Sequence, residues 1–159
     1  MFQYIHYSST KQEQYALVTK QLEALLAGEP NKIANLSNAS ALLGQFLDRI
    51  NWVGFYLHDG HELILGPFQG LPACVRIPLG KGVCGTAAFE QKTIRVADVN
   101  EFPGHIACDA ASRSEIVVPL VKDGELIGVL DIDSPEVNRF EEDDEIGLMH
   151  FANVLTRFL

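Results

Sequence analysis

The chain has 159 residues, of which 47% are hydrophobic and 21% charged, and its formal net charge is −9. This length and composition predict one globular domain, residues 1–159, large enough to bury a core. Lysine and arginine do not cluster, so we expect no nucleic-acid partner. The apolar runs are too short to span a bilayer, and residues 1–12 lack a basic segment followed by an apolar one. We therefore expect a cytoplasmic protein without a membrane partner.

Two helices are predicted near the N-terminus. Thr10 and Glu13 have the spacing of a capping box. The apolar residues that follow recur at helical spacing until Gly28 and Pro30 end the pattern. Residues 31–49 show the same periodicity. We expect both helices to serve packing and to carry no chemistry.

A strand pair is predicted at residues 51–57 and 62–65, joined by an Asp-Gly hairpin turn. Side chains alternate along the first strand, so Trp52 and Tyr56 share one face. The two rings are candidates for the wall of a pocket, although ordinary packing is the simpler explanation from these residues alone.

The middle of the chain alternates glycine-rich turns with short elements. Residues 66–70 are predicted to be a loop, and residues 73–79 a strand that carries Cys74. A glycine-rich turn then leads into a short helix with Cys84 in its first turn, where free N–H groups and the helix dipole would favour a thiolate. Residues 93–97 are a fourth short strand.

A long loop and a terminal helix complete this outline. Residues 98–113 have little periodicity and contain Pro103 and Gly104, so we predict a loop with one helical turn at most. Cys108 lies in this loop. Residues 140–159 are predicted to be a helix, and the acidic residues at its start suit the positive end of its dipole.

Three acidic residues stand on the strongest strand pair of the sequence. Glu115 begins an apolar strand, a turn at residues 122–125 reverses the chain, and the returning strand carries Asp131 and Asp133 at alternate positions. Both aspartates therefore point to one face, which they share with the apolar Val129. Hairpin pairing would bring Glu115 near one of the two aspartates.

Two neighbouring carboxyl groups that are partly desolvated cannot both ionise cheaply. One pKa rises by about 1–3 units, and that group holds a proton near neutral pH. A protonated acid suits proton donation, and an ionised neighbour suits the binding of an ammonium group. We favour this functional interpretation of Asp131 and Asp133 over a solvated pair, whereas an exposed strand end explains Glu115 equally well.

The order of the predicted elements indicates an α+β fold. Strands joined by hairpins lie between helices grouped at the two ends of the chain. We therefore expect a central antiparallel sheet with the N- and C-terminal helices packed on one face. Loops would cover the other face and enclose a cavity.

The three cysteines are an odd number, which argues against a secreted disulfide framework. Their spacing matches no common zinc pattern, so we expect no metal. Cys108 has polar neighbours and fits a reactive thiol better than a core residue. If disulfide chemistry occurs, Cys84 is its expected partner, because a helix start and a neighbouring loop can approach closely. Cys74, on a strand, has the stronger claim to a purely structural role.

The chain resembles the free methionine-(R)-sulfoxide reductases, enzymes built on a GAF domain, in the motifs NWVGFYL, GPFQG-x-x-AC-x-RIP-x-GKGVCGTAA, VADV, GHIACDAASRSEIVVPL and GVLDIDS. The similarity extends from about Asn51 to the terminal helix. General GAF domains share the fold but lack this set of cysteines and acids. The resemblance implies a single GAF domain that reduces free methionine (R)-sulfoxide without a metal or an organic cofactor.

The resemblance also assigns roles by position. Cys108 matches the nucleophile, which becomes a sulfenic acid as methionine leaves. Cys84, or by relay Cys74, matches the thiol that condenses with it to a disulfide, which a thioredoxin-type dithiol would reduce. Glu115 and Asp133 match acids that hold the substrate and protonate the sulfoxide oxygen.

The remaining implied contacts concern the substrate. Asp131 belongs with the acids that hold it, and Trp52 and Tyr56 match the pocket wall around its methyl and thioether groups. Backbone N–H groups around Ile106, Ala107 and Cys108 are candidates for its carboxylate.

Two other functions remain open at this point. One is a GAF sensor module that binds a small ligand or reports redox state without turnover. The other is a dimerisation domain built from the terminal helices, which in any case make a homodimer plausible. Cys108, Glu115 and Asp133 together favour the enzyme, because neither rival function needs all three.

Overall fold

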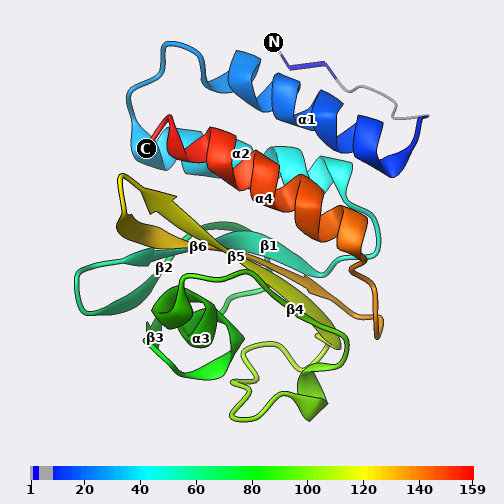
Figure 1. The fold of residues 1–159 in the computed structure, drawn as a ribbon, viewed down its shortest axis with the longest axis vertical. Coiled ribbons are helices and arrows are strands. Elements are labelled where there is room, and N and C mark those ends of the chain that lie inside the picture. Colours follow the sequence, from blue (N-terminus) through cyan, green and yellow to red (C-terminus); the bar gives the residue numbers. More distant parts are fainter. Residues whose placement is uncertain (1, 4–8) are drawn as a thin grey trace.

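The structure, a computed structural model, describes residues 2–3 and 9–159 (Figure 1). Its helices are α1 (Lys11–Leu26), α2 (Lys32–Phe46), α3 (Gly82–Glu90) and α4 (Glu142–Thr156), with a 3-10 turn η1 (Val99–Glu101). Its strands are β1 (Trp52–His58), β2 (Glu62–Gly70), β3 (Arg76–Pro78), β4 (Ile94–Val96), β5 (Ser114–Lys122) and β6 (Glu125–Ser134).

Two expectations about targeting and membranes bear on the described part. The prediction that no leader segment opens the chain concerns residues 1–12, of which residues 1 and 4–8 lie outside that part. Among the helices that the structure describes, none combines the length and the apolar character needed to cross a bilayer.

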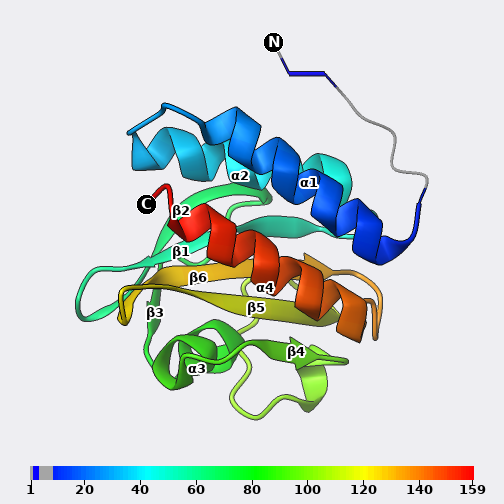
Figure 2. The same cartoon turned by 45° about the horizontal axis from the view of Figure 1, so that its top comes forward.

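The strands form one sheet in the order β3-β2-β1-β6-β5-β4, and every neighbouring pair is antiparallel. Helices α1, α2 and α4 lie together over one face of this sheet (Figure 1). The short helix α3 lies on the opposite face, with the chain that leads from it to β4 and β5 (Figure 2). The predicted α+β fold with terminal helices on one face is confirmed.

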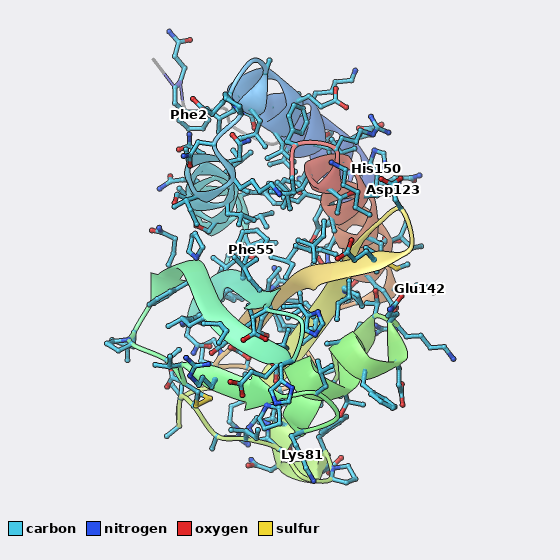
Figure 3. The ribbon with its side chains drawn as sticks, turned by 90° about the vertical axis from the view of Figure 1, so that its left-hand side faces the viewer. Phe2, Phe55, Lys81, Asp123, Glu142 and His150 are labelled. Carbon is cyan, nitrogen blue, oxygen red and sulfur yellow. A yellow bond between two sulfur atoms is a disulfide. The ribbon has the colours of Figure 1, made fainter. Side chains whose placement is uncertain are left out.

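The alternation along β1 separates two apolar clusters. Val53 and Phe55 are buried with the three long helices, whereas Trp52 and Tyr56 are buried on the α3 side. Figure 3 places Phe55 between the sheet and the helical layer. Burying such a side chain contributes roughly 1.5–3 kcal/mol, and the larger of the two clusters lies on the helical face.

Side-chain caps begin both N-terminal helices, namely the predicted Thr10 half of a capping box at α1 and, at α2, an Asn31 cap that was not predicted from the sequence. The Thr10 hydroxyl accepts a hydrogen bond from the Glu13 N–H at 3.3 Å, and the Asn31 side chain accepts one from the Ala34 N–H at 2.9 Å. Helix α2 ends at Phe46, three residues before the predicted end at residue 49.

The prediction of a loop at residues 66–70 was wrong, because β2 continues to Gly70. The pairing of β2 with β1 shifts between Gly54 and Tyr56, where Gly54 lies opposite Phe68 and Tyr56 opposite Leu65. This bulge accommodates Pro67, which has no N–H to donate to a regular ladder. The extension matters for function, because it carries the chain to the edge of the α3 face just before Cys74.

Candidate active site

The three predicted acids lie together on the α3 face of the sheet. Glu115 on β5 pairs with Asp133 on β6, and Asp131 lies two residues along the same strand, opposite Gly54 of β1. Glu115 and Asp131 are each 5% exposed, and Asp133 is half-buried. The prediction that hairpin pairing brings Glu115 next to the aspartates is confirmed.

Gly54 is required at this point of the sheet. A Cβ atom on it would lie 2.2 Å from Phe68 Cβ and 2.7 Å from Phe68 Cα. Contacts this short would force β1 and β2 apart. Because residue 54 has no side chain, β2 can pack close to β1 at the position where β1 lies opposite Asp131.

Burial raises the pKa of all three carboxyl groups. The pKa of Glu115 lies well above its ordinary value because the group is desolvated and faces the charges of Asp131 and Asp133. The pKa of Asp133 is raised well above its ordinary value by desolvation and by Asp131 and Asp109. Desolvation also raises the pKa of Asp131, but hydrogen bonds with Glu115 and Cys84 oppose that rise. The group thus holds a proton on Glu115 or Asp133 more readily than on Asp131.

Cys84 lies at the base of the site, beside the acids. Its thiol donates to Glu115 Oε1 at 3.8 Å, and the residue is 5% exposed. Cys84 sits in the first turn of α3, as predicted, but the expectation of a thiolate there was wrong. Desolvation and the charges of Asp131 and Glu115 raise the pKa of this thiol well above its ordinary value and outweigh the helix dipole.

Cys108 and Cys74 are joined by a disulfide, with their Cα atoms 5.4 Å apart. The expectation from position that Cys84 is the partner of Cys108 does not match this pairing, since Cys84 is the free thiol. Both bonded residues are half-buried, whereas Cys84 is buried. The disulfide therefore connects the chain after β2 to the loop before β5 near the surface.

Trp52 and Tyr56 form one wall of the site. The ring of Trp52 stacks on Tyr56 with centroids 5.9 Å apart and on Phe68 at 5.1 Å. Each ring also fixes the chain near the disulfide. Trp52 Nε1 donates to the Leu71 carbonyl at 3.2 Å, and the Tyr56 hydroxyl donates to the Cys74 carbonyl at 2.9 Å. The alternative explanation of these rings as packing alone does not account for their place in the pocket.

The same face holds a small pocket with a volume of about 40 Å³, which is room for a few water molecules. Its lining includes all the predicted site residues except Cys74 and Ala107: Trp52, Tyr56, Cys84, Ile106, Cys108, Glu115, Asp131 and Asp133. Ala107 is exposed, and the Cys108 N–H already donates to the Ile106 carbonyl at 3.1 Å. The predicted carboxylate-binding role of this backbone segment remains a prediction.

Sequence reasoning missed the residues that hold the Cys108 loop in place. The Asn51 side-chain amide donates to Asp109 Oδ2 at 3.0 Å and to Ser112 Oγ at 3.1 Å, and the Asp109 carboxylate accepts from the Ala111 N–H at 2.8 Å. Asn51 also anchors its own N–H on the Asp133 carbonyl at 2.9 Å. The Asp-x-x-Ser spacing at residues 109–112 was the available signal. A further pocket residue, His105, was also missed, and desolvation lowers its pKa.

Residues 32–157 match the family described as GAF domain. The chain belongs to the GAF domain family. Among curated proteins, this GAF domain is 54% identical over 149 residues to the free methionine-R-sulfoxide reductase of Escherichia coli, an alignment that covers 94% of this chain and 90% of that protein.

Two further relatives extend the likeness. The free methionine-R-sulfoxide reductase of Saccharomyces cerevisiae is 44% identical over 164 residues, covering 97% of the GAF domain described here and 91% of the yeast protein. The crystal structure of the Neisseria meningitidis free methionine-R-sulfoxide reductase in complex with its substrate superposes with a TM-score of 0.94 at 46% identity, covering 99% of this chain and 95% of that one. The resemblance predicted from the sequence motifs is confirmed.

Proposed function

We propose that the chain reduces free L-methionine (R)-sulfoxide to L-methionine. One observation carries the proposal: the disulfide-bonded pair Cys74 and Cys108 lies beside a small pocket that also holds three carboxyl groups, two of them buried and one half-buried. The relatives named as free methionine-R-sulfoxide reductases support it, because they align along almost the whole chain.

The carboxyl groups divide into two roles. Asp131, the carboxyl with the smallest tendency to hold a proton, binds the ammonium group of the amino acid. Glu115 and Asp133, whose pKa values are raised well above the ordinary range, retain a proton for the sulfoxide oxygen. Oxygen is a poor leaving group from a sulfoxide until it is protonated, so a neutral carboxylic acid lowers the barrier to thiol attack.

The sulfur chemistry then proceeds in two steps. The Cys108 thiolate attacks the sulfoxide sulfur, and the protonated oxygen passes to Cys108 as methionine leaves, which gives a sulfenic acid. The Cys74 thiol condenses with this sulfenic acid and releases water, which forms the Cys74–Cys108 disulfide. A third step restores both thiols at the expense of an external dithiol, which is itself oxidised to a disulfide.

We assign the third step to thioredoxin or a protein of its kind. Cys74 is half-buried, and Leu71 and Val75 on either side of it are 65% and 59% exposed. They offer an apolar surface next to the bond that a protein dithiol has to reach. Cys84 is too deeply buried to take part in this exchange.

Specificity follows from the closed shape of the pocket. A free amino acid presents an ammonium group to Asp131, which a methionine within a peptide chain lacks. The ammonium group of the substrate is bound at Asp131, and its methyl group lies against Trp52. One remaining substituent position on the sulfur then faces Glu115 and Asp133. The R epimer places oxygen there, whereas the S epimer places a methyl or a lone pair there.

The test is anaerobic incubation of the reduced chain with separated sulfoxide epimers, free or in a peptide, with methionine quantified by chromatography. We expect methionine from the free R epimer alone, and none with Cys108→Ser. Turnover of the peptide or of the S epimer would refute the specificity, and turnover by Cys108→Ser would refute the nucleophile. Binding of the sulfoxide without turnover by the reduced chain would favour the sensor function instead.

A further inference from the structure

Cys84 has no step in the proposed reaction, although it is the thiol nearest to the acids. Its sulfur and one oxygen each of Glu115 and Asp131 lie within 4.8 Å of one another. We propose that these three side chains form a binding site for Zn²⁺, with a fourth position open toward the pocket. The metal would act as an inhibitor and not as a cofactor.

The distances suit zinc. With Zn–S near 2.3 Å and Zn–O near 2.1 Å, tetrahedral ligands lie roughly 3.4–3.6 Å apart. Cys84 Sγ and Glu115 Oε1 are 3.8 Å apart, so this pair is already at nearly the required separation. The ligand atoms lie within 4.8 Å of one another, so even the longest possible separation would need to contract by only about 1.2–1.4 Å.

One residue of the cluster, Asp131, points to a missing ligand on independent grounds. Asp131 Oδ1 is buried and has no hydrogen-bond partner among the described residues. A buried acceptor without a partner is costly, and a bound cation would satisfy it. The three residues are each 5% exposed, so the cation would exchange water for three anionic ligands in a dry environment.

The donor set selects zinc over the common hard cations. A thiolate is a soft ligand that Mg²⁺ and Ca²⁺ do not favour, and these ions require about six or more oxygen ligands. Three protein ligands and one open position are the arrangement of zinc sites that bind a further small molecule. The sequence spacing of the cysteines gave no sign of this site, because two of its three ligands are acids brought together by strand pairing.

Zinc at this position would compete with the amino acid. It would occupy the carboxylates of Asp131 and Glu115, and its binding would release the protons of Cys84 and of the protonated acid to the buffer. Asp131 would then not be free to bind an ammonium group, and Glu115 would not be free to donate a proton. This consequence for turnover rests on the proposed function, whereas the binding site itself does not.

The oxidised chain gives a clean binding experiment, because the Cys74–Cys108 disulfide leaves Cys84 as the single free thiol of the three cysteines. Zn²⁺ is titrated against a chromogenic chelator, and Cd²⁺ and Co²⁺ serve as spectroscopic probes. We expect one tight metal per chain and a thiolate-to-metal charge-transfer band. Metal bound without this band would overturn the proposal.

Matched variants identify the ligands. Cys84→Ser should abolish the band and weaken Zn²⁺ binding at least about 100-fold, since even outer-shell changes cost about 10–100-fold. Glu115→Gln and Asp131→Asn should each weaken binding by a similar factor. Asp133→Asn removes a neighbouring carboxylate outside the cluster and should keep both the band and the stoichiometry. Equal affinities for Cys84→Ser and the parent chain would refute the site.

Two further measurements guard against ambiguous results. The Cys74→Ser/Cys108→Ser double variant also retains Cys84 alone but leaves the mouth of the pocket unlinked, so absence of binding in both this variant and the oxidised chain overturns the site. Inhibition is measured in a single turnover of pre-reduced chain freed of thiol reductant. There Zn²⁺ should compete with the sulfoxide, and Cys84→Ser should need at least about tenfold more metal for half-inhibition of its own rate. A chain that binds zinc without reducing the sulfoxide would refute the proposed function and leave the site intact.

Discussion

Asp144→Asn is expected to destabilise the helical layer strongly. The Asp144 carboxylate is 1% exposed and accepts four hydrogen bonds. They come from the Tyr15 hydroxyl at 2.7 Å, the Lys11 ammonium at 2.9 Å, the Arg139 guanidinium at 3.4 Å and the Glu141 N–H at 2.8 Å. This one carboxylate therefore connects α1, the start of α4 and the segment that follows β6.

The magnitude follows from what asparagine keeps and what it loses. It retains the shape and an acceptor oxygen, but the buried Arg139 is left with Asp48 as its carboxylate partner, at 3.1 Å and on an exposed side chain. Breaking a buried ion pair costs about 3–5 kcal/mol, and the remaining contacts favour the lower end, about 3 kcal/mol. In a chain of 159 residues this lowers Tm by about 6–12 °C.

The effect should depend on pH in one direction. Although burial opposes it, the hydrogen bonds from Glu141, Tyr15 and Lys11 lower the pKa of Asp144 below its ordinary value. A carboxyl group with a lowered folded pKa contributes stability above its unfolded pKa, near 3.9, and loses it as pH falls through the folded pKa. The stability difference between the parent chain and Asp144→Asn should therefore be full at pH 7 and shrink below about pH 4.

Urea unfolding of both chains at a series of pH values measures this difference. Tyr15→Phe is the matched control, because it removes only the hydroxyl and should cost about 1.5–3 kcal/mol, the range for a hydrogen bond to a charged group. A loss below about 1 kcal/mol for Asp144→Asn, or a loss of the same size at pH 3 and pH 7, would refute the reasoning.

Three predictions concern the reaction. Glu115→Gln removes a proton donor, so it should slow methionine release in a single turnover of the reduced chain by about 10²–10⁴-fold. Rapid quench measures this rate, and an unchanged rate would exclude Glu115 as the acid. The parent rate should persist at neutral pH and fall as pH rises through the raised pKa values of Glu115 and Asp133, and a rate that only increases with pH would argue against a neutral acid. Cys74→Ser should release one methionine per chain and leave a sulfenic acid on Cys108 that a dimedone label detects by mass spectrometry, whereas a disulfide to Cys84 in its place would reassign the resolving thiol.

Local pattern was sufficient to predict the faces of the sheet. Asp131 and Asp133 alternate with apolar residues along β6, and Glu115 begins the neighbouring strand, so strand geometry alone brings the three acids to one face. The aromatic pair on β1 follows from the same period of two. These predictions hold because side-chain direction in a strand depends only on parity.

The pairing of the cysteines lay beyond local pattern. Cys74 reaches Cys108 because β2 runs through its bulge to Gly70 and because Asn51 holds the loop at Asp109 and Ser112. Both are tertiary contacts between segments far apart in the chain. The glycines and the proline of residues 66–70 were typical of a loop, and only the partner strand shows that a bulge accommodates them.

Local pattern also failed to predict the protonation state of Cys84. That state distinguishes Cys84 from Cys74 and Cys108. The position at a helix start favoured a thiolate, but burial of the thiol and the charges of the neighbouring Asp131, Glu115 and Asp133 make a negative charge on its sulfur expensive. The raised pKa keeps Cys84 a neutral thiol, so in the proposed reaction it would not compete with Cys108 for the sulfoxide. In the proposed reaction, the two thiols that exchange electrons are Cys74 and Cys108, the two nearer the surface, where a thiolate is solvated and an external dithiol could attack. Tyr56 contacts both the pocket and the disulfide segment, since its ring lines the pocket and its hydroxyl donates a hydrogen bond to the Cys74 carbonyl. Loss of that hydroxyl should therefore slow disulfide formation more than it slows the release of methionine.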